Sequence, residues 1–149
     1  MKKFPLMGFD VSKHEAIIYD QGKERFTGTT LEGIGQAVVG TLQHPEETAN
    51  RFLKVQSIQT CQNELLDAFE KITGEKWKVT WMTSKELIEK GKEENKAGVG
   101  GWVLKLAVSH LYDVGQGRGM VAPSREEADA ELLGVKDETA EDIVAKLLG

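Results

Sequence analysis

Apolar residues along positions 15–97 switch repeatedly between a period of two and steps of three and four, and this alternation limits the possible folds. Period-two patterns predict β-strands at Glu15–Tyr19, Glu24–Thr29, Phe52–Ile58 and Trp77–Met82. Steps of three and four predict helices at Leu31–Gln43, Leu65–Ile72 and Thr83–Ala97. The order strand, strand, helix, strand, helix, strand, helix is typical of an α/β fold.

Local signals set the ends of these elements. Asp20-Gln21-Gly22 predicts a turn that joins the first two strands into a hairpin. Pro45 is expected to end the first helix, and Gly74 the second. Thr83 and Glu86 form a capping box that begins the third helix.

The helix at 31–43 has one apolar face, made of Leu31, Ile34, Ala37, Val38 and Leu42. The same helix carries three glycines, Gly33, Gly35 and Gly40. Each glycine costs about 1 kcal/mol relative to alanine in a helix interior. Close packing against another element is therefore the expected reason for them.

The C-terminal third predicts further helices. Trp102–Tyr112 is apolar on nearly every side, so this helix must be buried or line a cavity. Ser124 begins a capping-box helix that is expected to end at Gly134. Asp137 or Thr139 is expected to cap the last helix.

Composition narrows the class of protein. The 149 residues suit one domain spanning 1–149, since domains usually have about 100–200 residues. The net charge is −5, and residues 124–149 hold eight acidic and three basic side chains, so the rest is neutral. Without a basic stripe, no nucleic-acid binding is expected. No apolar run reaches the roughly 18 residues that span a bilayer, so we expect no membrane contact. No signal peptide is recognisable, and the chain has one cysteine, Cys61. Both observations lead us to expect a cytoplasmic protein.

No motif assigns catalytic, cofactor-binding or metal-binding residues. The loop Gly115–Gly119 resembles a dinucleotide loop, but its glycine spacing differs and it follows a predicted helix instead of a strand. The same objection applies to Gly98–Gly101. The histidines His14, His44 and His110 are far apart and show no metal-ligand spacing.

The helix Trp102–Tyr112 carries the candidate substrate-binding residues. Ser109, His110 and Tyr112 are polar groups in an otherwise apolar helix, and Leu106 adds an apolar contact. Small-molecule sites combine apolar walls with a few polar anchors, so His110 is a candidate anchor. The alternative is that His110 is a neutral, hydrogen-bonded structural residue.

Several segments together resemble one protein family. They are Ala16–Gly22, Phe26–Gly35, Gln62–Leu66, Thr73–Trp77 and Leu104–His110. In this order and spacing they resemble the C-terminal half of NmrA-like, isoflavone-reductase-like proteins, which are atypical short-chain dehydrogenases. Gly33 departs from the family pattern, which usually has Asp there.

The resemblance implies the substrate-side portion of an NAD(P)-binding Rossmann-type fold, without the N-terminal nucleotide-binding half. It implies a role in an oxidoreductase that acts on small aromatic or phenolic compounds with NADP or NAD, although this chain alone is expected to be inactive and to bind neither. Self-association, or pairing with the missing N-terminal half, is expected. The alternatives are a nucleotide-responsive regulatory protein of the NmrA type and a cofactor-free binding module.

Overall fold

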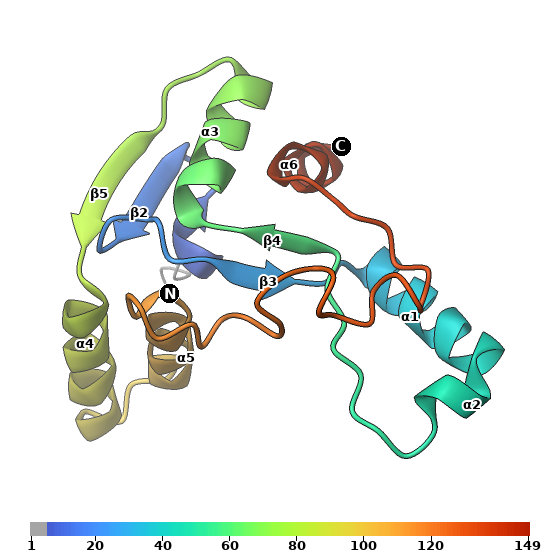
Figure 1. Cartoon of the computed structure of the whole chain (residues 1–149). Helices are drawn as coiled ribbons and strands as arrows, with labels where there is room; N and C mark the ends of the chain where they lie inside the picture. Colours follow the sequence, from blue (N-terminus) through green and yellow to red (C-terminus); the bar gives the residue numbers. More distant parts are fainter. Residues whose placement is uncertain (1–5) are drawn as a thin grey trace.

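Strand β2 is the central strand of a three-stranded sheet of order β1-β2-β5 (Figure 1). The computed structural model describes residues 6–149. The elements follow the chain in this order: η1 (Leu6–Gly8), β1 (Phe9–Asp10), β2 (Glu15–Tyr19), β3 (Phe26–Gly28), α1 (Leu31–Gln43), α2 (Pro45–Thr48), β4 (Ile58–Thr60), α3 (Gln62–Thr73), β5 (Lys78–Met82), α4 (Ser84–Lys96), α5 (Trp102–Tyr112) and α6 (Ala140–Leu148). The predicted α/β class is confirmed.

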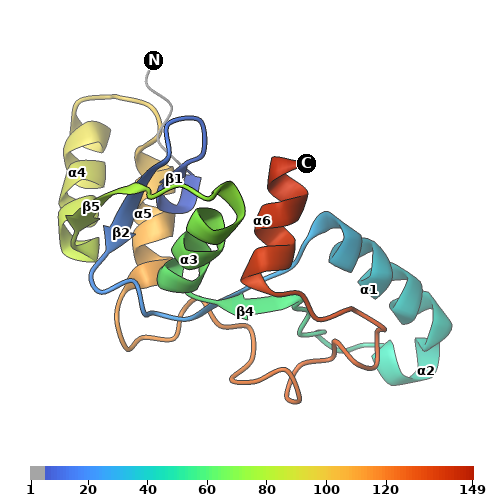
Figure 2. The same ribbon diagram turned by 90° about the horizontal axis from the view of Figure 1, so that it is seen from above.

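The two faces of β2 belong to different apolar clusters, because successive side chains of a strand point to opposite sides. Ala16 and Ile18 pack with Phe69 of α3. Tyr19 packs in a second cluster with Tyr112 of α5 and apolar residues of α4. The sheet therefore has α3 on one face and the α4–α5 pair on the other, as Figures 1 and 2 show.

The predicted hairpin of the first two strands is wrong. β2 has β1 along one edge in antiparallel orientation and β5 along the other in parallel orientation, with Glu15 opposite Lys78. With both edges of β2 occupied, β3 pairs instead with β4 in a separate antiparallel sheet, where Phe26 lies opposite Thr60. The expected turn at residues 20–22 is present, but it leads away from the first sheet.

Only the last residue of the strand predicted at Phe52–Ile58 lies in a strand, because β4 begins at Ile58. Ser57 still donates its N–H to the Gly28 carbonyl of β3 at 2.9 Å, but Lys54 bonds to a distant loop. Asp129 donates its N–H to the Lys54 carbonyl at 2.9 Å and accepts the Lys54 N–H on Oδ2 at 2.8 Å. These long-range bonds replace the ladder that the alternating pattern predicts.

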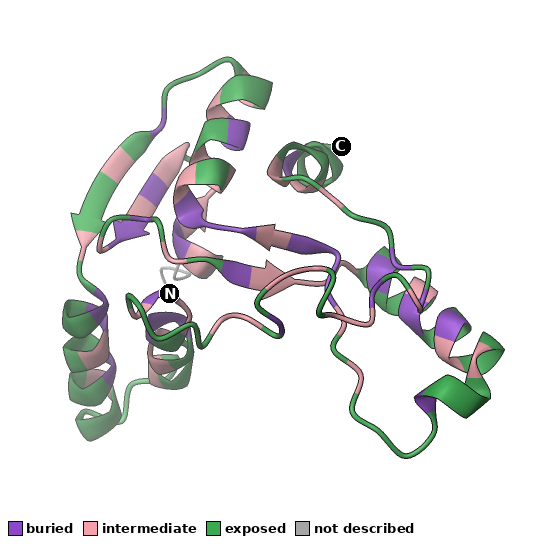
Figure 3. Cartoon of the chain, in the orientation of Figure 1, coloured by how far each residue is buried: buried purple, intermediate pink, exposed green. Residues whose placement is uncertain are grey.

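Helix α1 has the predicted bounds, and of its predicted apolar face only Ala37 is buried. Leu31 is 89% exposed and Leu42 is 76% exposed, whereas Gly33, Ala37 and Gly40 are the buried residues (Figure 3). Glycine lets another backbone approach closely, so the helix docks by its small residues and presents its large ones to solvent. Close packing is thus confirmed at Gly33 and Gly40, whereas a Cβ at Gly35 would meet nothing within 4 Å.

Most predicted helix ends are confirmed. Gly74 caps α3 in the left-handed region with φ of 70°, and Thr83 and Thr139 begin α4 and α6 with capping boxes. Pro45 differs from the expectation in part, because it follows α1 and also opens the short helix α2. Helix α5 is buried on one side only, where Tyr112 lies.

The helix predicted from Ser124 to Gly134 is absent, and this segment forms a series of turns. Its apolar residues are still used, because Ala130, Leu133 and Val135 form a buried cluster with Ala37 of α1. The apolar spacing reflects packing by an irregular chain, which periodicity cannot separate from a helix.

No helix within residues 6–149 is long and apolar enough to cross a bilayer.

Candidate functional site

Helix α5 carries all four predicted substrate-binding residues, and it packs along α4. Gly91 of α4 makes this contact close, because a Cβ added there would lie 3.1 Å from Leu106 Cδ2. Leu106 is accordingly half-buried between the two helices. The Leu106 side chain therefore packs, at least in part, between α4 and α5.

Ser109 and Tyr112 are buried, and their hydroxyl groups bond within the chain. Ser109 Oγ donates to the Leu106 carbonyl at 2.7 Å, and the Tyr112 hydroxyl donates to the Met7 carbonyl at 3.2 Å. The Tyr112 ring stacks on Tyr19 with ring centroids 5.3 Å apart. These two residues form the inner side of α5, under the exposed face that carries His110.

The phenol groups of this stack stay protonated. Burial raises the pKa of Tyr19 to about 12. Burial, together with the neighbouring Tyr19, raises the pKa of Tyr112 still further. Within residues 6–149 the Tyr19 hydroxyl has no hydrogen-bond partner. Neither phenol is prepared to act as a base near neutral pH.

His110 is exposed at the C-terminal end of α5, beside Arg118. The His110 Nδ1 atom lies 3.0 Å from Arg118 Nη1, and the same guanidinium nitrogen lies 3.2 Å from Asp113 Oδ2. A guanidinium group only donates hydrogen bonds, so Nδ1 must accept. When Nδ1 accepts from Arg118, Nε2–H is the hydrogen-bond donor that the ring offers to other groups.

The four candidates do not converge on one cavity. Ser109 and Tyr112 face inward, Leu106 faces α4, and His110 faces solvent. None of them lines the cleft between α3 and the C-terminal segment. Their role in substrate binding stays a prediction, and of the four, His110 is the one that can reach an external molecule.

The glycine loop after α5 already holds a carboxylate of the chain itself. Gly115 N–H donates to Glu24 Oε2 at 2.9 Å, and Gly117 N–H donates to Glu24 Oε1 at 3.2 Å. The amides that could meet a phosphate are thus occupied by a group that would repel one. The other glycine segment, residues 98–101, follows α4 instead of a strand. Neither described loop fits a dinucleotide.

A cleft of about 690 Å³ lies between α3 and residues 137–141. Buried Ile58 and Ala68 contribute apolar lining, and three basic side chains contribute charge. Each of these cations is paired with a carboxylate: Arg25 with Glu64 at 2.8 Å, Lys71 with Glu141 at 2.6 Å and Arg125 with Asp137 at 3.3 Å. The cleft is therefore not a ready anion site. Sequence reasoning missed it because its lining comes from distant segments without a shared motif.

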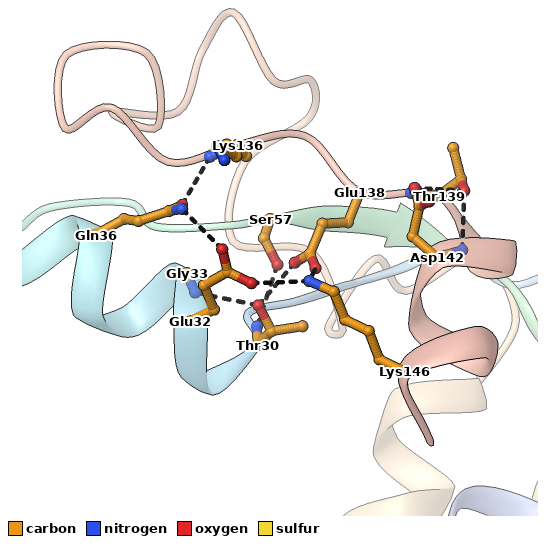
Figure 4. A network of polar contacts seen from close by, with 10 residues as sticks. All are labelled: Thr30, Glu32, Gly33, Gln36, Ser57, Lys136, Glu138, Thr139, Asp142 and Lys146. Atoms are coloured by element: carbon orange, nitrogen blue, oxygen red, sulfur yellow. Dashed lines mark hydrogen bonds and ion pairs between the residues drawn. The ribbon is translucent and has the colours of Figure 1, made fainter. Parts of the chain in front are cut away.

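Next to this cleft, a polar network joins α6 to the start of α1 (Figure 4). Lys146 Nζ donates to Glu138 Oε1 at 2.7 Å and to Glu32 Oε2 at 2.9 Å. Thr30 Oγ1 donates to Glu138 Oε2 at 2.7 Å and accepts the Gly33 N–H at 3.1 Å. The network therefore combines the N-cap of α1 with an ion pair to α6.

The Glu138 carboxylate is the least exposed charge of this network, since its side chain is 9% exposed. Burial opposes its ionisation, but hydrogen bonds from Lys146, Ser57 and Thr30 outweigh burial and lower its pKa. The hydrogen bonds to Glu138 and Glu32 in turn raise the pKa of Lys146. We assign these groups to holding the fold together, because each charge is satisfied within the chain.

No cluster of three or more His, Cys, Asp or Glu residues that could hold a metal ion occurs in the described part of the chain.

No family model matches the chain. Two fungal oxidoreductases are similar to it in sequence. The oxidoreductase poxI of Penicillium oxalicum is 59% identical over 148 residues, which cover 99% of this chain and 47% of poxI. The oxidoreductase aprR of Aspergillus flavus is 36% identical over 80 residues, which cover 54% of this chain and 27% of aprR. The chain thus spans about half the length of poxI and matches a smaller share of aprR.

A solved structure supports the fold. The crystal structure of a nucleoside-diphosphate-sugar epimerase from Staphylococcus aureus aligns with a TM-score of 0.58 at 19% identity. The alignment covers 90% of this chain and 44% of the epimerase. At this identity the likeness concerns the α/β fold alone. Again, the chain is similar to less than half of a longer protein.

Proposed function

We propose that this chain is the substrate-side portion of an NAD(P)H-dependent oxidoreductase of the NmrA-like, isoflavone-reductase-like type. It acts on small aromatic or phenolic compounds only together with a nucleotide-binding portion. The observation that carries this proposal is the 59% identity with the oxidoreductase poxI over 99% of the chain, at 47% of the length of poxI. A piece so similar to one part of an oxidoreductase is best interpreted as the same part.

The geometry of α5 supports a substrate-binding role for its exposed end. With Nδ1 accepting from Arg118, the Nε2–H group of the exposed His110 can donate to an external molecule. A carbonyl or phenolic oxygen would accept that hydrogen bond. The inward Tyr112 and Ser109 fix the helix by their bonds to Met7 and Leu106, so the donor is held on a packed element.

The cofactor belongs, in this proposal, to the portion outside this chain. The described glycine loops do not fit a dinucleotide, and Glu24 occupies the better of them. No step of hydride transfer is therefore assigned to residues of this chain. Its own residues bind and orient the organic substrate, and the nucleotide portion would supply NADP or NAD.

The experiment that tests this proposal compares the chain with a chimera. In the chimera, the chain replaces the matching part of poxI, so that the remaining part of poxI is present in its natural order. NADPH and NADH are titrated into both proteins and binding is measured by calorimetry. We expect binding to the chimera and none to the chain, since only the chimera would contain a nucleotide site.

The other outcomes decide between alternatives. Binding of either nucleotide by the chain itself, with a micromolar Kd, would contradict the proposal and favour a nucleotide-responsive regulator. A folded chimera that binds no nucleotide, while the chain binds a phenolic probe such as 4-hydroxyacetophenone, would favour a cofactor-free binding module.

A further inference from the structure

Helix α1 presents a row of large apolar side chains to solvent. Leu31, Ile34, Val38 and Leu42 are 89%, 48%, 56% and 76% exposed. Their spacing places them along one side of the helix. We call these four residues the α1 stripe. A stripe of this kind normally faces a core, so its exposure indicates a surface that another element covers.

The stripe borders an apolar groove of about 450 Å³. Ile34, Val38 and Leu42 line it together with Ala37 and Val55. The stripe is thus one wall of a hollow between α1 and the segment that precedes β4. A partner could insert side chains there as well as cover the helix.

Charge does not explain the exposure. Glu32 is the only charged residue among the thirteen of α1, and its carboxylate is held by Lys146. Helices that face solvent usually carry charged side chains on the outer face. Compared with α4, in which charged residues dominate the sequence SKELIEKGKEENK, α1 lacks a solvated face.

The neighbouring backbone also lacks partners. In the described part of the chain, the N–H groups of Phe52, Leu53 and Val55, which are exposed or half-buried residues, donate no hydrogen bond, while Lys54 between them bonds to Asp129. The Phe52 side chain is fully exposed. Carbonyl groups of another chain can accept hydrogen bonds from unpaired main-chain N–H groups that lie beside an apolar surface.

We propose that the α1 stripe and residues 52–56 bind the portion of the longer oxidoreductase that this chain does not contain. This proposal rests on the proposed function and names its partner and docking surface. The length of poxI supports this occupant, because 53% of it lies outside the matched part, by subtraction of the printed 47%, whereas α1 and residues 52–56 lie inside it. The occupant presents apolar side chains to the stripe and main-chain carbonyl groups to the free N–H donors.

The first test is co-expression of this full chain with the unmatched portion of poxI, which carries the affinity tag. We expect the two to purify together in a one-to-one complex. A variant with Ile34→Gln and Val38→Gln should reduce the recovered chain by about tenfold, because polar groups then replace apolar contact. The matched control has Val103→Gln and Leu147→Gln, at residues that are 59% and 62% exposed on α5 and α6, and should behave as wild type.

Hydrogen exchange provides a second readout, which does not require the poxI portion to fold by itself. The amides of residues 52, 53 and 55 and the exposed side of α1 are followed in the free chain and in the poxI chimera. We expect slower exchange of these amides by about tenfold or more in the chimera. The amides of α4 serve as the internal control and should be unchanged.

The outcomes separate this inference from the proposed function. A chimera that binds NADPH while residues 52–56 exchange as fast as in the free chain overturns the docking surface and leaves the function standing. Protection of the same residues without NADPH binding supports the docking surface and contradicts the function. A free chain that dimerises through the stripe and does not release it to the poxI portion identifies a second copy as the occupant and overturns the proposal.

Discussion

Gly40 of α1 lies directly against the backbone of Leu133. A Cβ atom built at Gly40 would be 2.3 Å from the Leu133 carbonyl oxygen, which is far inside contact distance. This approach closes the cluster of Ala37, Ala130 and Val135, and it fixes α1 with its large side chains outward. The glycine that weakens the helix locally is therefore what lets the helix dock.

The first prediction follows from comparing Gly40 with Gly35. Gly40→Ala should lower the free energy of unfolding by about 1–3 kcal/mol, because overpacking against a backbone outweighs the gain in helix propensity. Gly35→Ala, where a Cβ meets nothing within 4 Å, should raise it by about 0.5–1 kcal/mol. Urea denaturation measures both. Equal stabilisation by the two alanines would show that α1 does not pack on Leu133.

Gln62 provides the second prediction, because its buried amide connects α3 to β2. Its Oε1 accepts the Tyr19 N–H at 2.8 Å, and its Nε2 donates to the carbonyls of Met7 and Ile17 at 3.1 and 3.0 Å. Gln62→Met keeps the volume but leaves these groups unpaired, so we expect a loss of about 2–5 kcal/mol. Gln43→Met, at an exposed residue of α1, is the control, and a loss of stability in Gln62→Met as small as the loss in Gln43→Met would contradict the assigned role.

The third prediction concerns acid stability. The lowered pKa of Glu138 means that its contribution is fully present above its unfolded pKa, near 4.5, and is lost as pH falls through the folded value. Glu138→Gln should therefore destabilise the chain at pH 7 and reduce the loss of stability that wild type shows as the pH falls from 7 to below 4.5. Thermal unfolding across this range measures it. Glu93→Gln, on the exposed side of α4, should leave the pH dependence as in wild type.

Sequence patterns predicted the local features of this chain well and the long-range ones poorly. The capping box at Thr83, the glycine cap at Gly74 and Thr139, one of the two expected caps of the last helix, were correct, because their chemistry lies within a few residues. The side on which α1 is buried could not be predicted, because the partner of Gly40 lies 93 positions away at Leu133. An apolar stripe predicts that something covers it, but not that the cover belongs to the same chain.

The same distinction applies to the candidate site. Polar residues in an apolar helix indicated α5, but their spacing could not show that Ser109 and Tyr112 bond internally while His110 meets Arg118. The pairing of Glu24 with Gly115 joins residues 91 positions apart and had no sequence signal. Contacts of this kind depend on how the elements pack, which periodicity does not encode.

The fourth prediction tests the Glu24 contact. Glu24→Gln removes the negative charge of the carboxylate that accepts the Gly115 and Gly117 N–H groups, so these charge-assisted hydrogen bonds are weakened or lost. Hydrogen exchange at residues 115–118 should become faster by about threefold to tenfold, with α4 unchanged. Glu46→Gln on α2 is the matched control. Unchanged exchange in the loop would show that the carboxylate does not order it.

The last prediction separates the two interpretations of His110 in the poxI chimera. A pocket hydrogen bond contributes about 0.5–1.5 kcal/mol, so His110→Ala should lower kcat/KM by about 2-fold to 13-fold if the bond persists in the transition state. Because the ring is exposed and its contact with Arg118 lies at the surface, the free energy of unfolding should change by less than about 0.5 kcal/mol.

Leu106→Ala should show the opposite pattern, with a loss of about 1–2 kcal/mol of stability, because this half-buried side chain packs on Gly91 of α4. His44→Ala, at the exposed junction of α1 and α2, is the control for removing an imidazole. If His110→Ala instead loses stability while kcat/KM is unchanged, the histidine is a structural residue. The substrate must then be bound elsewhere, and the cleft between α3 and residues 137–141 becomes the next candidate.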